Sequence, residues 1–172
     1  MIGHGNAETW GNSLLQPPSI VERLLSGGFE PGEHDRPQRC RAIIFSSDGQ
    51  EVLGIARSKP GREPYTVYPG GGMEESDPTA AACIWRELDE ELGVTPQDVE
   101  LDKRVLSFGD EYYFVGYAPQ PLGELVVSGP EAERDPDISG TYSPGWYRVD
   151  TLGQHSFFPL EVTDLIVGAS QQ

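Results

Sequence analysis

The chain has 172 residues, with 28 acidic against 12 basic side chains and a formal net charge of −16. A chain of this length makes one domain of ordinary size and can bury a real core. The charge argues against nonspecific binding to nucleic acid and to anionic membrane surfaces, because both need basic patches. An anionic substrate would therefore need help from a divalent cation.

Targeting signals and cysteine usage point to one compartment. No apolar run approaches the roughly 18 residues of a membrane span, and no signal peptide is recognisable at the N-terminus. The two cysteines, Cys40 and Cys83, form no spaced framework. We therefore expect a soluble, reduced, cytoplasmic protein.

Residues 1–37 form an N-terminal arm that is rich in Gly and Pro. Within it, Ser19 and Glu22 are spaced as a capping box, and Leu24 and Leu25 follow. This pattern predicts a short helix that packs on the domain or on a partner subunit, with an unpacked leader as an equally good alternative. The domain proper is expected to span residues 38–172.

The rest of the chain reads as alternating strands with two long helices. The expected elements are strands at 41–45, 51–55 and 65–68, a helix at 78–92, strands at 99–108, 111–118 and 146–149, and a final helix from Pro159 with Leu160, Leu165 and Ile166 as its apolar face. Residues 119–145 are a long Pro-, Gly- and acid-rich connection, and a loop of that length is usually functional or mobile. The pattern predicts a layered α/β domain with a mixed sheet.

The 78–92 helix carries two faces when it is placed on a helical wheel. The expected core stripe is Ala81, Ile84, Trp85, Leu88 and Leu92. A second face holds the three glutamates Glu87, Glu90 and Glu91. Like charges at this spacing repel one another, so the glutamates are either a solvated acidic face or oxygen ligands for Mg²⁺ or Mn²⁺. The charge pattern alone favours the solvated face.

The residues around this helix favour a ligand site. Gly70, Gly71 and Gly72 precede it and allow the backbone to approach a ligand closely. Asp77 followed by a proline is expected to cap the helix, and Gly93 is expected to end it. The order is therefore a strand, a glycine loop and a capped helix with an acidic face.

The segment Arg86–Val94, RELDEELGV, resembles the second half of the Nudix box, R-E-U-x-E-E-x-G-U, at every fixed position. The resemblance to the Nudix hydrolase family covers about residues 39–167. The first half of the box departs from the pattern, because a Glu is expected where Asp77 or the next residue, a proline, stands. We prefer the alignment that places Asp77 there, since it keeps an acidic side chain.

The resemblance implies a Nudix fold, an α/β/α sandwich with a central mixed sheet. It further implies a hydrolase that uses Mg²⁺ or Mn²⁺ to cleave a nucleoside diphosphate linked to another group, by attack of water on phosphorus. Its site residues would be the metal ligands Glu87, Glu90 and Glu91, the orienting Arg86 and the phosphate-binding Gly70, Gly71 and Gly72. The general base would be Glu91 or Glu131.

Contacts to the rest of the substrate are less specified. Arg57, Lys59 and Arg62 could meet phosphates, with solvated loop cations as an equal alternative. Aromatic residues that could stack on a base are Phe108, Tyr113, Tyr142 and Trp146, although most are expected in the core.

Three other functions occur on this fold. The first is a nucleotide-sensing module without hydrolysis, which loss of box glutamates would signal, and all three are present. RNA decapping fits poorly with the negative charge, and isoprenoid isomerisation needs a catalytic cysteine that we cannot place. The expected partner is therefore a small anionic nucleotide, with no nucleic acid and no membrane. A homodimer is an open possibility that the family suggests.

Overall fold

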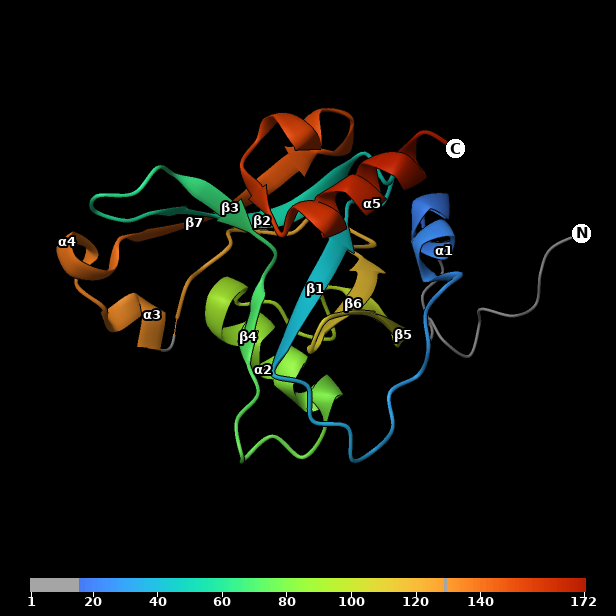
Figure 1. The fold of residues 1–172 in the computed structure, drawn as a ribbon, viewed down its shortest axis with the longest axis horizontal. Coiled ribbons are helices and arrows are strands. Elements are labelled where there is room, and N and C mark those ends of the chain that lie inside the picture. Colours follow the sequence, from blue (N-terminus) through green and yellow to red (C-terminus); the bar gives the residue numbers. More distant parts are fainter. Residues whose placement is uncertain (1–15, 129) are drawn as a thin grey trace, which may run out of the picture.

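One mixed β-sheet organises the protein in the computed structural model, which describes residues 16–128 and 130–172 (Figure 1). The strands of the described chain are β1 (Arg39–Phe45), β2 (Glu51–Ser58), β3 (Tyr65–Val67), β4 (Gly70–Gly72), β5 (Glu100–Phe108), β6 (Glu111–Tyr117), β7 (Thr141–Arg148) and β8 (Phe157–Phe158). The helices are α1 (Ser19–Leu25), α2 (Ala80–Leu92), α3 (Pro130–Glu133), α4 (Pro136–Ser139) and α5 (Leu160–Ser170), with a 3-10 helix at Val149–Gln154.

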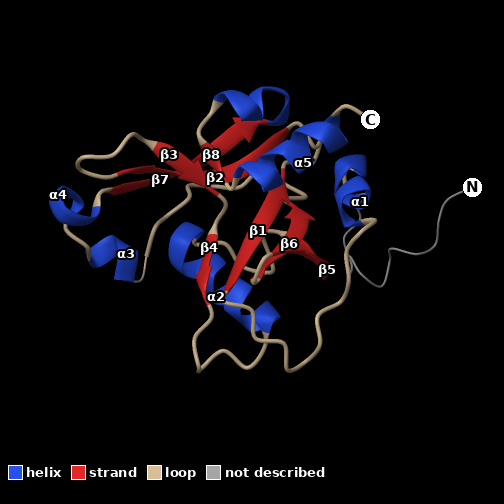
Figure 2. Cartoon of the chain, in the orientation of Figure 1, coloured by secondary structure: helices blue, strands red, loops and turns tan. Residues whose placement is uncertain are grey.

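The strand order is β5-β6-β1-β2-β3-β8, with β4 paired to β1 and β7 paired to β2 (Figure 2). β1 runs parallel to β6, and β3 runs parallel to β8. The remaining pairs are antiparallel. The predicted mixed sheet is confirmed, because both kinds of pairing occur in it.

Helices cover both faces of the sheet, as alternation along β1 requires. Ile43 and Phe45 face a core that includes residues of α1 and α5. Ala42 and Ile44 face a second core, which includes residues of α2. The α/β/α sandwich expected from the resemblance is confirmed. None of the described helices is long and apolar enough to cross a membrane.

The helix of the N-terminal arm packs on the domain. Its apolar residues Ile20, Val21, Leu24 and Leu25 are buried in the core shared with α5. The predicted capping box is wrong, because the residue before Ser19 holds the N-cap position and makes no side-chain bond. The part of the arm at residues 1–15 lies outside the described residues.

The final helix has a different buried face from the predicted one. Ile166 is buried as expected, but Leu160 and Leu165 are exposed. The buried positions are Val162, Ile166 and Ala169, together with Thr163. Contact with α1 sets this face, where the Arg23 guanidinium donates to the Ala169 carbonyl over 2.8 Å.

The connection at 119–145 is partly ordered into secondary structure. It contains α3 and α4, and its last residues already belong to β7, which begins at Thr141. Ser128 ties the segment to α2, since its amide donates to the Glu90 carbonyl. The Val126 amide likewise donates to the carbonyl of Leu92 over 3.2 Å. The segment therefore runs along the C-terminal half of α2.

Candidate active site

The glycine stretch before α2 is a strand and not the predicted loop. β4 pairs antiparallel with β1, with Gly71 opposite Cys40. A Cβ built on Gly71 would lie 2.6 Å from Oε1 of Glu87, so the carboxylate occupies the space that any other side chain would fill. Gly70 has a φ of 142°, which few other residues adopt. The glycines therefore let α2 press its carboxylates against strand backbone.

This contact decides which side of α2 faces inward. The predicted core stripe is right at Ile84, Leu88 and Leu92, but Ala81 is exposed and the Trp85 side chain is only half-buried. Cys83, Glu87 and Glu91 take the buried positions on the side of β4. The buried face is rotated toward the glutamates because β4 has no side chains to keep the helix away.

Two of the three glutamates are enclosed by protein. Glu87 is 7% exposed and Glu91 is 8% exposed, whereas Glu90 is partly exposed. The Gly70 amide donates to Oε2 of Glu91 over 3.2 Å. Burial of carboxylates is costly unless charge and hydrogen bonds compensate, so a simple solvated face does not describe this site.

Arg86 joins two of these carboxylates. Its Nη1 donates to Oε1 of Glu87 over 2.9 Å and to Oε2 of Glu90 over 3.5 Å. Its Nη2 donates to the Gly72 carbonyl over 3.1 Å, which fixes the guanidinium against β4. The arginine thus holds two glutamates of the helix toward the glycine strand.

Asp77 is the strongest partner of Arg86, with two nearly parallel hydrogen bonds of 2.9 and 2.8 Å between them. Arg86 holds the pKa of this carboxyl at about 2, below the ordinary 3.8. The predicted capping role is wrong, because Thr79 is the N-cap and accepts from the Ala82 amide over 3.1 Å. Gly93 ends the helix in the left-handed conformation, as predicted.

The cysteines lie in the core beside this site. Cys40 and Cys83 are both buried and free. The neighbouring Cys40 and burial raise the pKa of the Cys83 thiol, which keeps it protonated and a poor nucleophile. Cys83 therefore does not suit a thiol-dependent isomerase chemistry.

The donor chemistry of the site suits a hard divalent cation. Carboxylate oxygens of Glu87, Glu90 and Glu91 are the ligand type that Mg²⁺ and Mn²⁺ prefer. Within the described residues, no group of three or more His, Cys, Asp or Glu side chains is arranged to hold a metal ion. Arg86 contacts two of the three glutamates here, Glu87 and Glu90.

The two arginines expected at the substrate lie on the sheet and its hairpin. Arg57 is on β2 and stacks on the ring of Tyr142, with 3.7 Å between the guanidinium carbon and the ring centre. Arg62 lies in the β2–β3 turn, 5.0 Å from the ring centre of Tyr65. Glu131, the second candidate base, belongs to α3, and its side chain is outside the described part of the structure.

The four aromatic candidates divide between core and site. Tyr113 is fully buried, and Phe108 packs against the same core. Trp146 is half-buried against the α2 core. Tyr142 touches a predicted substrate residue, Arg57. Two residues beside Arg57 and Tyr142, namely Tyr65 and Arg134, were not expected at the site from the sequence. The alternation of side chains along the strands was the available signal for Tyr65.

Comparison with solved structures agrees with this architecture. A MutT from work on Aliivibrio salmonicida and Vibrio cholerae has a TM-score of 0.53 at 20% identity, over 77% of this chain and 98% of that chain. A C. elegans Ap4A hydrolase binary complex has a TM-score of 0.55 at 15% identity, over 77% and 96% of the two chains. The NUDIX domain of Shewanella oneidensis NrtR, complexed with ADP ribose, scores 0.51 at 18% identity, over 76% and 85%.

These identities show a shared fold. No curated protein matches the chain in sequence. A family model described as the NUDIX domain matches residues 35–164, which is most of the chain and includes the whole of α2. The chain therefore belongs to the NUDIX domain family and is a Nudix hydrolase.

Proposed function

We propose that the protein is a divalent-metal-dependent pyrophosphohydrolase that cleaves a nucleoside diphosphate linked to another group. The supporting observation is the enclosure of Glu87 and Glu91 against the glycine strand, with Glu90 beside them at the edge. Arg86 pairs with two of these three carboxylates, Glu87 and Glu90, which leaves an excess of negative charge suited to cations. Water would attack phosphorus and expel the second phosphate.

Glu87, Glu90 and Glu91 would hold Mg²⁺ or Mn²⁺. The cation, when bound, supplies neutralisation of the pyrophosphate charge and an acidified water. The bidentate bond between Arg86 and Asp77 does not involve the glutamates, so it would keep the helix oriented with a cation bound. The protein's main contribution is then position and charge.

Proton removal from the attacking water is assigned to Glu91, with Glu131 as the second candidate. Glu91 already accepts a hydrogen bond from the Gly70 amide, which fixes one carboxylate oxygen and orients the other. The backbone of Gly71 and Gly72 would lie against the substrate phosphates, where no side chain intervenes. The role of Glu91 follows from its place in the Nudix box, whereas Glu131 belongs to a distant segment.

Release of phosphate tests the proposal. The protein is incubated with a panel of nucleoside diphosphate derivatives and a coupling phosphatase, with Mg²⁺ or with EDTA. We expect release from at least one nucleotide substrate that EDTA abolishes. Measurable nucleotide binding without metal-dependent release across the panel would instead establish a nucleotide-sensing module.

The same proposal includes the kind of substrate, the cellular compartment and the oligomeric state. The substrate is a small anionic nucleotide, without nucleic acid or membrane, and the protein acts in the cytoplasm, where buried free cysteines such as Cys40 and Cys83 stay reduced. A homodimer is the proposed assembly. Sedimentation of the purified chain would test it directly.

A further inference from the structure

Arginine and tyrosine side chains alternate across three strands at one end of the sheet. Arg57 on β2 lies opposite Tyr65 on β3 and opposite Tyr142 on β7 in the strand register. Residues paired across neighbouring strands point to the same face of a sheet. The three side chains therefore form one continuous surface.

Two further arginines extend this surface at its ends. Arg62 lies over the ring of Tyr65, 5.0 Å from its centre. Arg134 donates from Nη1 to the Tyr142 hydroxyl over 3.4 Å. The resulting order is Arg62, Tyr65, Arg57, Tyr142 and Arg134, and we call it the arginine–tyrosine row.

The arginines of this row have no ion-pair partner among the described side chains. Three of the 12 basic residues of a chain with net charge −16 gather there. Among the side chains that the structure describes, Arg57, Arg62 and Arg134 make no ion pair with a carboxylate. Neighbouring guanidinium groups without a carboxylate are suited to an anionic ligand such as a phosphate.

The Arg57 side chain also lacks a hydrogen-bond partner at one of its nitrogens. Its Nε is buried and has no hydrogen-bond partner among the described residues. Its Nη2 donates to the Ser139 carbonyl over a long 3.4 Å. A buried donor without an acceptor is costly, so a ligand oxygen at this point would be strongly favoured.

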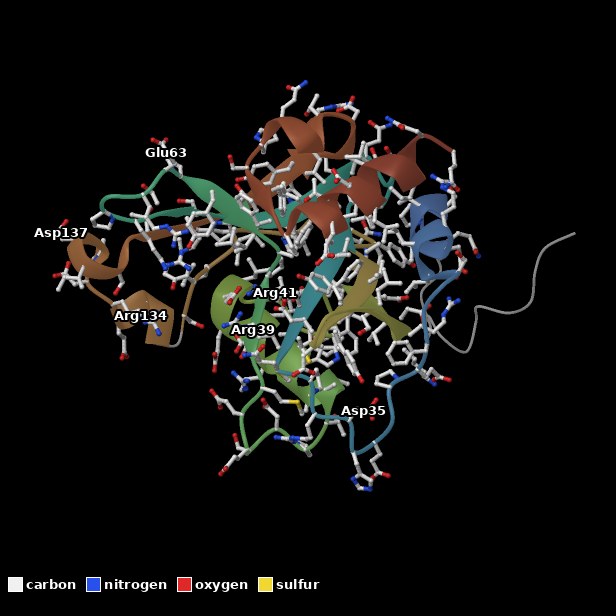
Figure 3. All side chains as sticks on the ribbon, in the orientation of Figure 1. Asp35, Arg39, Arg41, Glu63, Arg134 and Asp137 are labelled. Carbon is white, nitrogen blue, oxygen red and sulfur yellow. The ribbon has the colours of Figure 1, made fainter. Side chains whose placement is uncertain are left out.

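The row lies on the same face of the sheet as the acidic helix. Ile55, two residues before Arg57, belongs to the hydrophobic core that includes Leu88 of α2. Side chains two residues apart on a strand share a face and lie about 7 Å apart. Figure 1 shows α3 below the β2, β3 and β7 strands and α4 beyond the end of β7, and Figure 3 shows Arg134 beside α3.

The chain itself limits how far the row can lie from the glutamates. Ser128 is bonded to the backbone of Glu90, and Arg134 follows six residues later. Six residues span at most about 20 Å, which is an upper limit on the separation between the two ends. A nucleotide with a chain of phosphates can bridge a gap of this order.

A hollow beside the row provides a place for a flat group. It has a volume of about 530 Å³, and its lining includes Arg62, Tyr65, Val67 and Phe158. The rings of Tyr65 and Phe158 meet edge to face with 6.5 Å between their centres, and Phe158 is 42% exposed. Aromatic walls with a nearby cation are typical of sites that stack a nucleobase.

We propose that the arginine–tyrosine row binds the part of the substrate beyond the scissile pyrophosphate, as an aromatic base with its adjoining phosphate. This inference rests on the proposed hydrolase function and narrows its substrate class. It favours a dinucleoside polyphosphate over a nucleotide sugar, because a sugar has neither a π-face for Tyr142 nor an extra charge for Arg57. Stacking of one base changes affinity by on the order of 5- to 100-fold.

Hydrolysis of matched substrates tests the inference. A dinucleoside polyphosphate and a nucleotide sugar with the same nucleoside are compared in the wild type and in Arg57→Ala, Tyr142→Ala and Tyr142→Phe. We expect the two alanine variants to lower kcat/KM for the dinucleoside polyphosphate by at least about tenfold, and for the sugar by less than about threefold. Tyr142→Phe should keep most of the activity, because it retains the ring.

Arg148→Ala is the matched control. Arg148 lies on the same strand, β7, is exposed, and pairs with Asp150 away from the row. The Arg148→Ala variant should leave kcat/KM unchanged for both substrates. Equal losses of kcat/KM for both substrates in the row variants, or no loss in either, would overturn the inference even though hydrolysis itself is intact.

Binding in EDTA separates this inference from the proposed function. Calorimetry measures the dissociation constant of the dinucleoside polyphosphate without turnover. Weaker binding by Arg57→Ala and Tyr142→Ala, with thermal unfolding unchanged, supports the row even if no metal-dependent hydrolysis is found. Unchanged binding in both variants refutes the row, whatever the protein hydrolyses.

Discussion

Arg86 and Asp77 form a bidentate ion pair, with Nε donating to Oδ1 over 2.9 Å and Nη2 donating to Oδ2 over 2.8 Å. Asp77 is buried and also accepts from the Glu74 amide over 2.9 Å. The Arg36 guanidinium donates to its backbone carbonyl. Asp77, which departs from the Nudix box by residue type, therefore anchors the arginine that orders the glutamates of α2.

Asp77→Asn should destabilise the fold. The variant loses a charge-assisted pair and leaves Arg86 partly unpaired, at a cost of about 2 kcal/mol in the free energy of unfolding. Urea denaturation at neutral pH measures this loss. Asp89→Asn, at an exposed position of the same helix, should change the stability by less than about 0.5 kcal/mol. Equal stability of the two variants would contradict the anchoring role.

The Arg86–Asp77 pair also predicts that the stability of the fold depends on pH in the acidic range. Arg86 lowers the pKa of Asp77 to about 2 from 3.8, so the unfolded chain takes up this proton before the folded chain does. The stabilisation is complete above about pH 4 and is lost as the pH falls through about 2. The stability gap between wild type and Asp77→Asn should therefore narrow across this window in urea titrations. A constant gap would show that this carboxyl does not titrate there.

Gly71→Ala should damage turnover more than it damages the fold. The new Cβ would lie 2.6 Å from Oε1 of Glu87, so the carboxylate must move away from β4. A displacement of about 1 Å can cost on the order of a hundredfold in rate. At Gly72 the nearest atom to a new Cβ is the Gln38 carbonyl oxygen at 4.0 Å. Gly72→Ala is therefore the control. Steady-state kinetics with Mg²⁺ compare the two variants, and equal losses of kcat in both would exclude displacement of Glu87 as the cause.

Glu90→Gln and Glu91→Gln should each lower kcat by orders of magnitude while thermal unfolding stays near that of the wild type. Both changes keep size and remove the charge that a cation and a proton require. Asp89→Asn provides the control on the same helix, because its side chain is exposed and should leave turnover unchanged. Wild-type turnover in both glutamine variants would refute the assigned site.

The sequence alone determined the features that depend on neighbouring residues of one helix. The spacing of Glu87, Glu90 and Glu91 requires one helical face, and Arg86 meets Glu90 one turn later. Gly93 was predicted as the stop because it tolerates the left-handed conformation that it adopts. These features depend on local geometry, which is a property of short segments.

Only the tertiary structure decided what distant segments do to one another. The wheel placed Ala81 in the core, but packing against the glycine strand turned Glu87 inward instead. Likewise, Arg57 met Tyr65 and Tyr142 through the register of three strands. Strand register and helix rotation are set by packing between segments far apart in sequence. The hydrophobic pattern of one segment does not show which distant segment it will contact.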